Sequence, residues 1–190
     1  LLLAFLVWNP TPLQILELKK FDWLMSTKEP VQDTMILLVD LDEEIVEAYG
    51  GYPLPRQRLA EIHIELLQKG ALGVGWVFSF PQPDRLGGDE VFAEALCYGG
   101  SVIGMFEDGS GNYPDTSGTV VLGNNNNAGI YSTGVVQNID ILKNCSNQGI
   151  AIAPTEVDNL VRRVPLMMKT PDGFVSAYGT EVMKVLAGNS

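Results

Sequence analysis

The chain has 190 residues, of which 46% are hydrophobic and 18% are charged, so it is long enough and apolar enough to fold around a core of its own. Lys and Arg together number 12, whereas Asp and Glu number 23, which gives a formal net charge of -11. This acidic balance argues against a nucleic-acid-binding protein, which needs a basic surface, and it gives no attraction to anionic lipid.

The first stretch, Leu1–Trp8, is strongly apolar and has no basic residue before it. A signal peptide begins with a basic region, so this stretch is not a complete signal peptide. It is also far shorter than the ~20 residues that a membrane helix needs. Two interpretations stay open: the end of a membrane helix, or a hydrophobic segment that packs on the domain.

A helix is predicted over Leu13–Met25, directly after the helix-breaking residues Asn9–Pro12. Apolar side chains cover much of its circumference, and its polar side consists of charged residues between Glu17 and Asp22. A helix of this kind is buried, or it lies against a membrane or a partner.

The most informative stretch is Ile36–Glu44. Four apolar residues, Ile36–Val39, predict a strand that is covered on both faces, as in a parallel sheet between layers of helices. Asp40 and Asp42 follow it two residues apart, so they leave the same face of the strand. They stand at its carboxyl end, where open α/β sheets place ligands.

Two arginines are candidate partners of this acidic pair, because a planar guanidinium binds a carboxylate in a bidentate way. They are Arg56 and Arg163, the second of which stands beside an apolar, strand-like run. Together with Asp40 and Asp42 they form either a polar ligand-binding pocket or an internal ion-pair network. We favour the ion-pair network, since buried carboxylates need a partner.

The next elements alternate between helices and strands. Pro55 opens a helix that carries an apolar stripe and ends at Gly70, and His63 lies on the flank of the stripe as a predicted core residue. The other predicted elements of this half are a short helix at Glu43–Tyr49, a strand at Ala71–Phe80, a helix at Glu90–Leu96 with Asp89 as N-cap, and a strand at Ser101–Phe106. This alternation predicts an α/β fold with a mixed, mainly parallel sheet flanked by helices.

The second half is less regular. Residues 107–128 are rich in Gly, Asn, Ser and Asp and predict a long loop. The predicted elements here are small strands at Val120–Leu122 and Gly149–Ala153, a short helix at Ile139–Cys145, a strand-like run at Val161–Met168, a turn at 171–173 and an amphipathic helix at Ser176–Leu186.

The cysteines are Cys97 and Cys145, and the one histidine is His63, so no set of residues has the spacing of a zinc site. We expect no metal and no cofactor. The two cysteines form either a disulfide in an oxidising compartment or two buried thiols. We favour the thiols, because free cysteine is commonly a small core residue.

An enzymatic alternative rests on Asp40-x-Asp42 after an apolar strand. This spacing resembles the first motif of the haloacid-dehalogenase-like phosphatases, in which one Asp attacks phosphorus, the other is the acid/base, and both help hold magnesium. Glu44 occupies the position where that family has a small hydroxyl residue. A magnesium-dependent phosphatase-like enzyme is therefore the second hypothesis.

A series of motifs, in order, resembles the type-two CHASE domain (cyclases/histidine kinases associated sensory extracellular). The resemblance covers Ile36 to about Leu186, and this chain differs at Val77 and at Asn159, where the family usually has Asp and Gly. The motifs are ILLVDLDEE with Tyr52–Arg56, the helix end Leu66–Ala71, the series Phe80, Pro83, Asp84, Asp89, Phe92 and Ala95, and the late signature Val161–Leu166.

The resemblance implies a single extracytoplasmic sensor domain of a bacterial transmembrane signalling protein, without catalysis of its own. Residues 1–30 would be the membrane-proximal apolar segment and a juxtamembrane helix, and 31–190 the sensor domain on the periplasmic or extracellular side. It further implies flanking membrane helices and a cytoplasmic adenylate cyclase, histidine kinase or similar output domain. The expected partners are a small-molecule or physical stimulus, the membrane, and a second copy of the chain in a homodimer.

Overall fold

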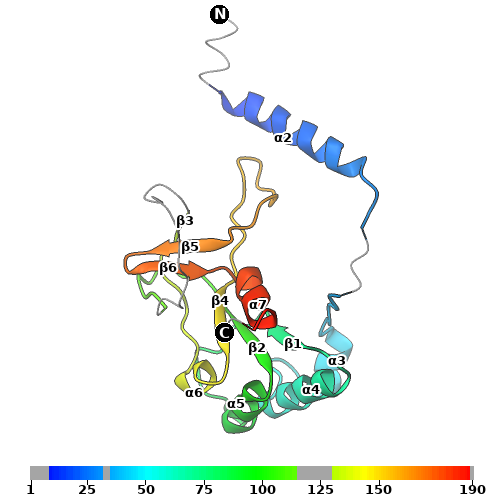
Figure 1. Ribbon diagram of the computed structural model, residues 1–190, viewed down its shortest axis with the longest axis vertical. Helices are drawn as coiled ribbons and strands as arrows, with labels where there is room; N and C mark the ends of the chain where they lie inside the picture. Colours follow the sequence, from blue (N-terminus) through cyan, green and yellow to red (C-terminus); the bar gives the residue numbers. More distant parts are fainter. Residues whose placement is uncertain (1–8, 32–34, 115–129, 189–190) are drawn as a thin grey trace, which may run out of the picture. The chain divides into compact units, whose positions relative to one another are not determined.

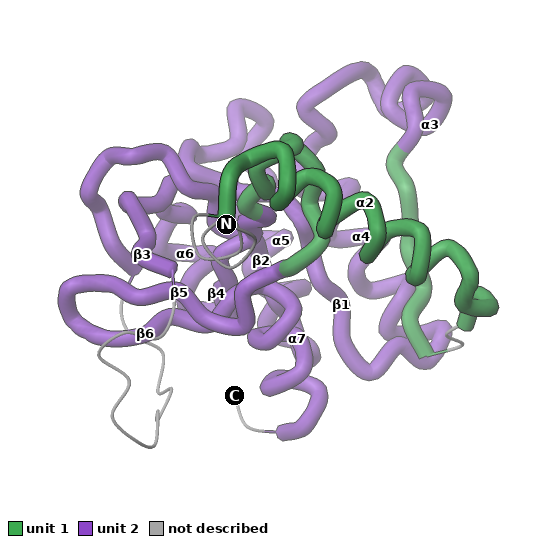
Figure 2. Tube along the Cα trace, turned by 90° about the horizontal axis from the view of Figure 1, so that it is seen from above, with its two compact units in different colours: residues 1–41, 154–163 green, residues 42–153, 164–190 purple. Residues whose placement is uncertain are grey.

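The computed structural model describes residues 9–31, 35–114 and 130–188. The chain divides into two compact units, which are coloured separately in Figure 2. Unit 1 consists of Leu1–Leu41 and Pro154–Arg163, and unit 2 consists of Asp42–Ala153 and Val164–Ser190.

Unit 1 contains the helix α2, Thr11–Ser26, which confirms the helix predicted over Leu13–Met25. Pro10 precedes it, and Pro12 lies in its first turn, where the missing N–H costs nothing. None of its side chains is buried. The apolar stretch Leu1–Trp8 lies outside the described residues.

The strand predicted at Ile36–Val39 is absent, and this prediction is wrong. The chain has no regular secondary structure there, and the exposed fractions of Leu38 and Val39 are 88% and 48%. An apolar run indicates that a segment can be buried, but a strand exists only where a neighbouring strand accepts and donates its backbone hydrogen bonds. The apolar pattern of Ile36–Val39 does not show whether such a neighbouring strand is present.

Unit 2 is an α/β domain, as the alternation of elements predicted (Figure 1). Its described helices are α3 (Glu43–Ala48), α4 (Arg56–Gln68), α5 (Asp89–Cys97), α6 (Asp140–Lys143) and α7 (Tyr178–Leu186). One sheet is parallel, with the order β1-β2-β4, and the other has the order β3-β5-β6 with β3 parallel and β6 antiparallel to β5. The strands are β1 (Gly73–Trp76), β2 (Gly100–Met105), β3 (Ile130–Tyr131), β4 (Asn147–Ile150), β5 (Met167–Thr170) and β6 (Gly173–Ser176).

Helices lie on both faces of the parallel sheet. Gly75 and Gly149 face α7, since a Cβ at either position would collide with Tyr178 of that helix. The next residue of β1, Trp76, points to the opposite face. There its ring packs edge-on against Phe92 of α5, with 5.7 Å between ring centroids, so α5 covers the second face.

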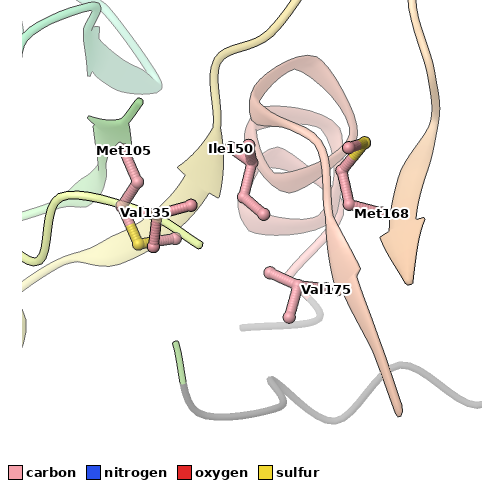
Figure 3. Close-up of a cluster of buried hydrophobic side chains, with 5 residues drawn as sticks. All are labelled: Met105, Val135, Ile150, Met168 and Val175. Atoms are coloured by element: carbon pink, nitrogen blue, oxygen red, sulfur yellow. The ribbon is translucent and has the colours of Figure 1, made fainter. Parts of the chain in front are cut away.

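The two sheets share a hydrophobic cluster, which Figure 3 shows. Met105 of β2 and Ile150 of β4 contribute from the parallel sheet, and Met168 and Val175 contribute from β5 and β6. Val135 completes the cluster, and all five side chains are at most 1% exposed. This core fixes the β5–β6 hairpin to the carboxyl ends of β2 and β4.

Several predicted boundaries need correction. The strand predicted at Ala71–Phe80 is regular only over β1, because Phe80 N–H donates to the side chain of Asn138 instead of to a strand. The run Val161–Met168 becomes a strand only at Met167, so the two arginines in it do not lie in a strand. Asp89 is the first residue of α5 rather than its N-cap, which is Gly88.

The remaining predictions of elements fared better. The short helix predicted at 43–49, the strand at 101–106 and the final helix at 176–186 correspond to α3, β2 and α7. The short helix and strand predicted at 139–145 and 149–153 correspond to α6 and β4, with β4 beginning two residues earlier, at Asn147. The strand predicted at Val120–Leu122 lies outside the described residues.

Candidate functional site

Three of the four residues predicted as a polar cluster have local partners of their own. Asp42 is the N-cap of α3, and its Oδ1 accepts the backbone N–H of Ile45 at 2.9 Å. Asp40 is exposed in unit 1. Arg163 pairs with Glu156 at 3.3 Å. A joint role for the four side chains in ligand binding stays a prediction.

The fourth residue, Arg56, is buried at the start of α4 and is the centre of an ion-pair network. Its guanidinium pairs with Asp89 and donates to the carbonyl of Gln82, and it lies 5.2 Å from the centroid of the Phe80 ring. Its backbone N–H donates to Oδ2 of Asp84 at 3.1 Å. Burial lowers the pKa of this arginine. Arg56 therefore takes its carboxylate partners from the loop before α5 and from α5 itself.

Asp84 holds that loop together. Its carboxylate accepts the N–H of Leu86 at 3.2 Å and that of Gly88 at 3.3 Å, in addition to the N–H of Arg56. Burial alone would raise the pKa of Asp84, but these backbone donors and the charge of Arg56 outweigh it and lower the pKa. Asp89 completes the network, since its Oδ2 accepts the N–H of Asp84 at 3.0 Å. The network fixes the β1–α5 connection to the first turn of α4.

His63 has the structural role that the sequence predicted. It is fully buried between α4, β1 and β2, with Nδ1 3.1 Å from Nε1 of Trp76 and Nε2 3.2 Å from Oγ of Ser101. Burial lowers its pKa to about 4, so the ring is neutral near pH 7. A neutral, enclosed histidine with both nitrogens engaged is part of the core.

Cys97 and Cys145 form a disulfide, with 4.5 Å between their Cα atoms, so the interpretation as buried thiols is wrong. Cys97 ends α5 and Cys145 follows α6, and these helices lead into the neighbouring parallel strands β2 and β4. Helices that precede adjacent parallel strands end at the same edge of the sheet. This relationship brings the cysteines together, although 48 residues separate them in sequence.

A pocket of about 720 Å³ opens beside this disulfide in unit 2. Its size suits a small molecule. One of its residues, Glu181 of α7, is fully buried, and its carboxylate accepts from Nδ2 of Asn147 at 2.8 Å and from Nζ of Lys184 at 2.9 Å. Most of the other polar groups around the pocket are amides, and the polar lining includes Gln137, Lys143, Asn144, Asn147, Gln148 and Glu181.

Sequence reasoning missed this pocket. The available signal was the polar run 144–148, which follows α6 directly and includes the first two residues of β4. Within the described residues, no three His, Cys, Asp or Glu side chains gather in a way that could hold a metal ion. In the same part of the chain, no helix has the length and apolar character needed to cross a membrane.

A disulfide is typical of domains in an oxidising compartment, and the pocket beside it has the size of a small-molecule site. The comparison with family models gives the particular family: the model of the CHASE2 domain matches residues 1–188, so the chain belongs to the CHASE2 family. These are extracellular sensory domains of signalling proteins, and their role is sensory rather than catalytic. No curated protein and no solved structure matched the chain.

Proposed function

We propose that this chain is the extracytoplasmic signal-sensing domain of a bacterial transmembrane signalling protein. It passes a stimulus through the membrane to a cytoplasmic output domain, either a nucleotide cyclase or a kinase. The observation that carries this proposal is the match of the CHASE2 model over residues 1–188. The disulfide Cys97–Cys145 supports the location, because disulfides persist in oxidising compartments.

In this proposal, residues 1–30 are the membrane-proximal part and residues 31–190 are the sensor domain. Leu1–Val7 is the end of a preceding membrane helix, and α2 is the juxtamembrane helix that follows it. The apolar composition of Leu1–Val7 supports this assignment. Two copies of the chain pair in the membrane.

The pocket beside the disulfide is our first proposal for the place where a small-molecule stimulus binds. Its lining of amides, hydroxyls and one buried carboxylate suits a polar solute that is held by hydrogen bonds. Our second proposal for the binding site of the stimulus is the set Asp40, Asp42, Arg56 and Arg163.

The location is tested by the oxidation state of Cys97 and Cys145 in cells that produce the full-length protein. Cells are treated with a maleimide reagent under denaturing conditions, before and after reduction, and a variant with serine at both positions is the control. We expect labelling only after reduction. Labelling of both thiols without prior reduction would contradict an extracytoplasmic location.

The site at which the stimulus binds is tested with two variants of the full-length protein. The readout is the activity of the output domain. Asn144→Trp fills the pocket from an exposed position, and Asp42→Asn alters the acidic pair. We expect the response to the stimulus to disappear in Asn144→Trp and to persist in Asp42→Asn. The opposite pattern would favour the four-residue set over the pocket.

A further inference from the structure

Arg162 of unit 1 uses both free edges of its guanidinium group to bind carboxylates. Along one edge, Nε and Nη2 donate to Oδ1 and Oδ2 of Asp22 at 2.6 and 2.7 Å. Along the other edge, Nη1 and Nη2 donate to Oδ1 and Oδ2 of Asp158 at 2.8 and 2.7 Å. Nη1 also lies 3.5 Å from Oε2 of Glu156. The side chain of Arg162 is only 6% exposed, so nearly all of its donors are directed at these acids.

The turn before Arg162 holds Asp158 in the required position. The N–H of Glu156 donates to the carbonyl of Leu160 at 3.0 Å, and the N–H of Leu160 donates to Oδ1 of Asp158 at 3.3 Å. Between them, Asn159 has a φ of 62°, in the left-handed region that Asn tolerates better than most residues. The turn therefore holds the Asp158 carboxylate beside Arg162 through contacts that all lie within residues 156–162.

Asp22 comes from a different part of the chain, 140 residues away, in α2. Its side chain is 44% exposed, whereas that of Asp158 is 14% exposed. The hydrogen bonds from Arg162 lower the pKa of Asp22 below its ordinary value and that of Asp158 to about 2. Both acids are therefore ionised over the whole range of pH that cells meet, and these contacts do not change with physiological pH.

We propose that Arg162 is a positioning residue that joins α2 to residues 154–163 within unit 1, so that the helix and this segment move as one body. This inference rests on the proposed function only for its consequence: if α2 is the juxtamembrane helix, this ion-pair cluster lies on the path of the signal to the membrane. Arg is required, because Lys has no second edge with which to bind two carboxylates in a bidentate way.

The test measures amide hydrogen exchange of the chain, with Cys97 and Cys145 oxidised, in Asp22→Asn, Arg162→Gln and Arg162→Lys. We expect the amides of α2 to exchange faster in all three variants, by a factor of about ten or more, while the amides of α4 stay protected. Arg163→Gln is the matched control, since Arg163 is the next residue, is 78% exposed and pairs with Glu156 at 3.3 Å. Unchanged α2 exchange in Asp22→Asn would overturn the proposal.

Exchanging the charges of Asp22 and Arg162 distinguishes a specific contact between these two residues from a general loss of stability. Asp22→Arg alone places two guanidinium groups together, whereas Asp22→Arg with Arg162→Asp restores opposite charges and keeps Asp158 beside them. We expect the single variant to have fast α2 exchange and the double variant to recover protection. Absence of recovery would contradict a specific pairing of these two positions.

Movement as one body is tested by spin labels at Lys19→Cys and Val157→Cys, two exposed positions in α2 and in the 154–163 segment. We expect one narrow distance distribution that broadens in Asp22→Asn and not in Arg163→Gln. A distribution that is equally broad in both backgrounds would overturn the proposal. Because these measurements need no signalling output, they test the contact between Arg162 and Asp22 independently of the proposed function.

Discussion

The indole N–H of Trp76 donates to Nδ1 of His63 over 3.1 Å, and this bond determines the tautomer of the histidine. Since Nδ1 accepts, the ring proton is assigned to Nε2, which faces Oγ of Ser101 at 3.2 Å. That hydroxyl donates onward to the carbonyl of Leu96 at 2.7 Å. A second proton, on Nδ1, would face the indole N–H and find no acceptor. The hydrogen-bond chain and the burial of the ring thus both favour neutral His63.

A pH dependence of stability follows from this arrangement. Burial lowers the pKa of His63 from 6.5 to about 4. Between these values the unfolded chain binds a proton that the folded chain does not, so stability falls as the pH falls. The full contribution of the neutral ring is present above about pH 6.5, and about 3 kcal/mol is lost by about pH 4. Urea unfolding at several pH values between 7 and 4.5 measures most of this loss.

The variant His63→Gln separates the titration of His63 from that of the carboxylates, because the variant and the unchanged protein have the same carboxylates. The variant is expected to be less stable at pH 7, because Gln has no ring to stack with Trp76, but its stability should decline less between pH 7 and 4.5. If the two proteins lose stability in parallel over this range, the histidine does not titrate as the structure implies.

The elements that the sequence predicted well are those defined by local periodicity. In α4, the apolar stripe around Leu59 and the stop at Gly70, which has a φ of 98°, depend only on residues within a few turns. The run Ile36–Val39 and the disulfide failed for the opposite reason. A strand depends on its partner, and the pairing of Cys97 with Cys145 depends on the order of β2 and β4 in the sheet.

At the candidate sites, too, the sequence did not show which distant residues contact each other. The motif series contained Arg56, Asp84 and Asp89, but the sequence did not indicate that they bind one another. These contacts join residues 28 and 33 positions apart, through a loop that folds back on the start of α4. Nor could spacing reveal that Arg162, rather than its neighbour Arg163, is the nearly buried arginine. Burial and long-range partners come from the tertiary structure.

The ion-pair network at Arg56 is expected to stabilise unit 2. Arg56→Gln leaves Asp89, whose side chain is 17% exposed, without its cationic partner. Removal of one partner from a buried pair costs about 3–5 kcal/mol, so the urea midpoint should fall strongly. Arg58→Gln is the control two residues along the same helix, where the pair with Glu61 is about half exposed and should change stability little. Equal midpoints for the two variants would show that the network contributes nothing.

Asp42 is expected to contribute as a helix cap. Asp42→Ala removes the acceptor of the Ile45 N–H at the start of α3, and a lost N-cap costs about 1 kcal/mol. Asp40→Ala, two residues earlier, is the matched control and should leave stability unchanged. Unfolding by urea distinguishes the cases. A loss of several kcal/mol in both variants would instead support a buried cluster that contains both acids.

The approach of α7 to β4 requires glycine at position 149. A Cβ there would lie 2.5 Å from Cα of Tyr178 and 3.2 Å from Cβ of Glu181, so the helix would have to move away from the sheet. Overpacking of this kind costs about 1–3 kcal/mol, which urea unfolding of Gly149→Ala measures.

Gly179→Ala is the control for this change, because the same methyl group is added to α7 itself. Apart from its chain neighbours and the backbone of α7 itself, position 179 has no atom within 4 Å of an added Cβ, and Ala in a helix is favoured over Gly by about 0.5–1 kcal/mol. The two variants should therefore shift the urea midpoint in opposite directions. If Gly149→Ala raised the midpoint as Gly179→Ala does, the contact between Gly149 and Tyr178 would not limit the approach of α7 to β4. Since Glu181 also lines the pocket, Gly149→Ala alone should alter any ligand binding there.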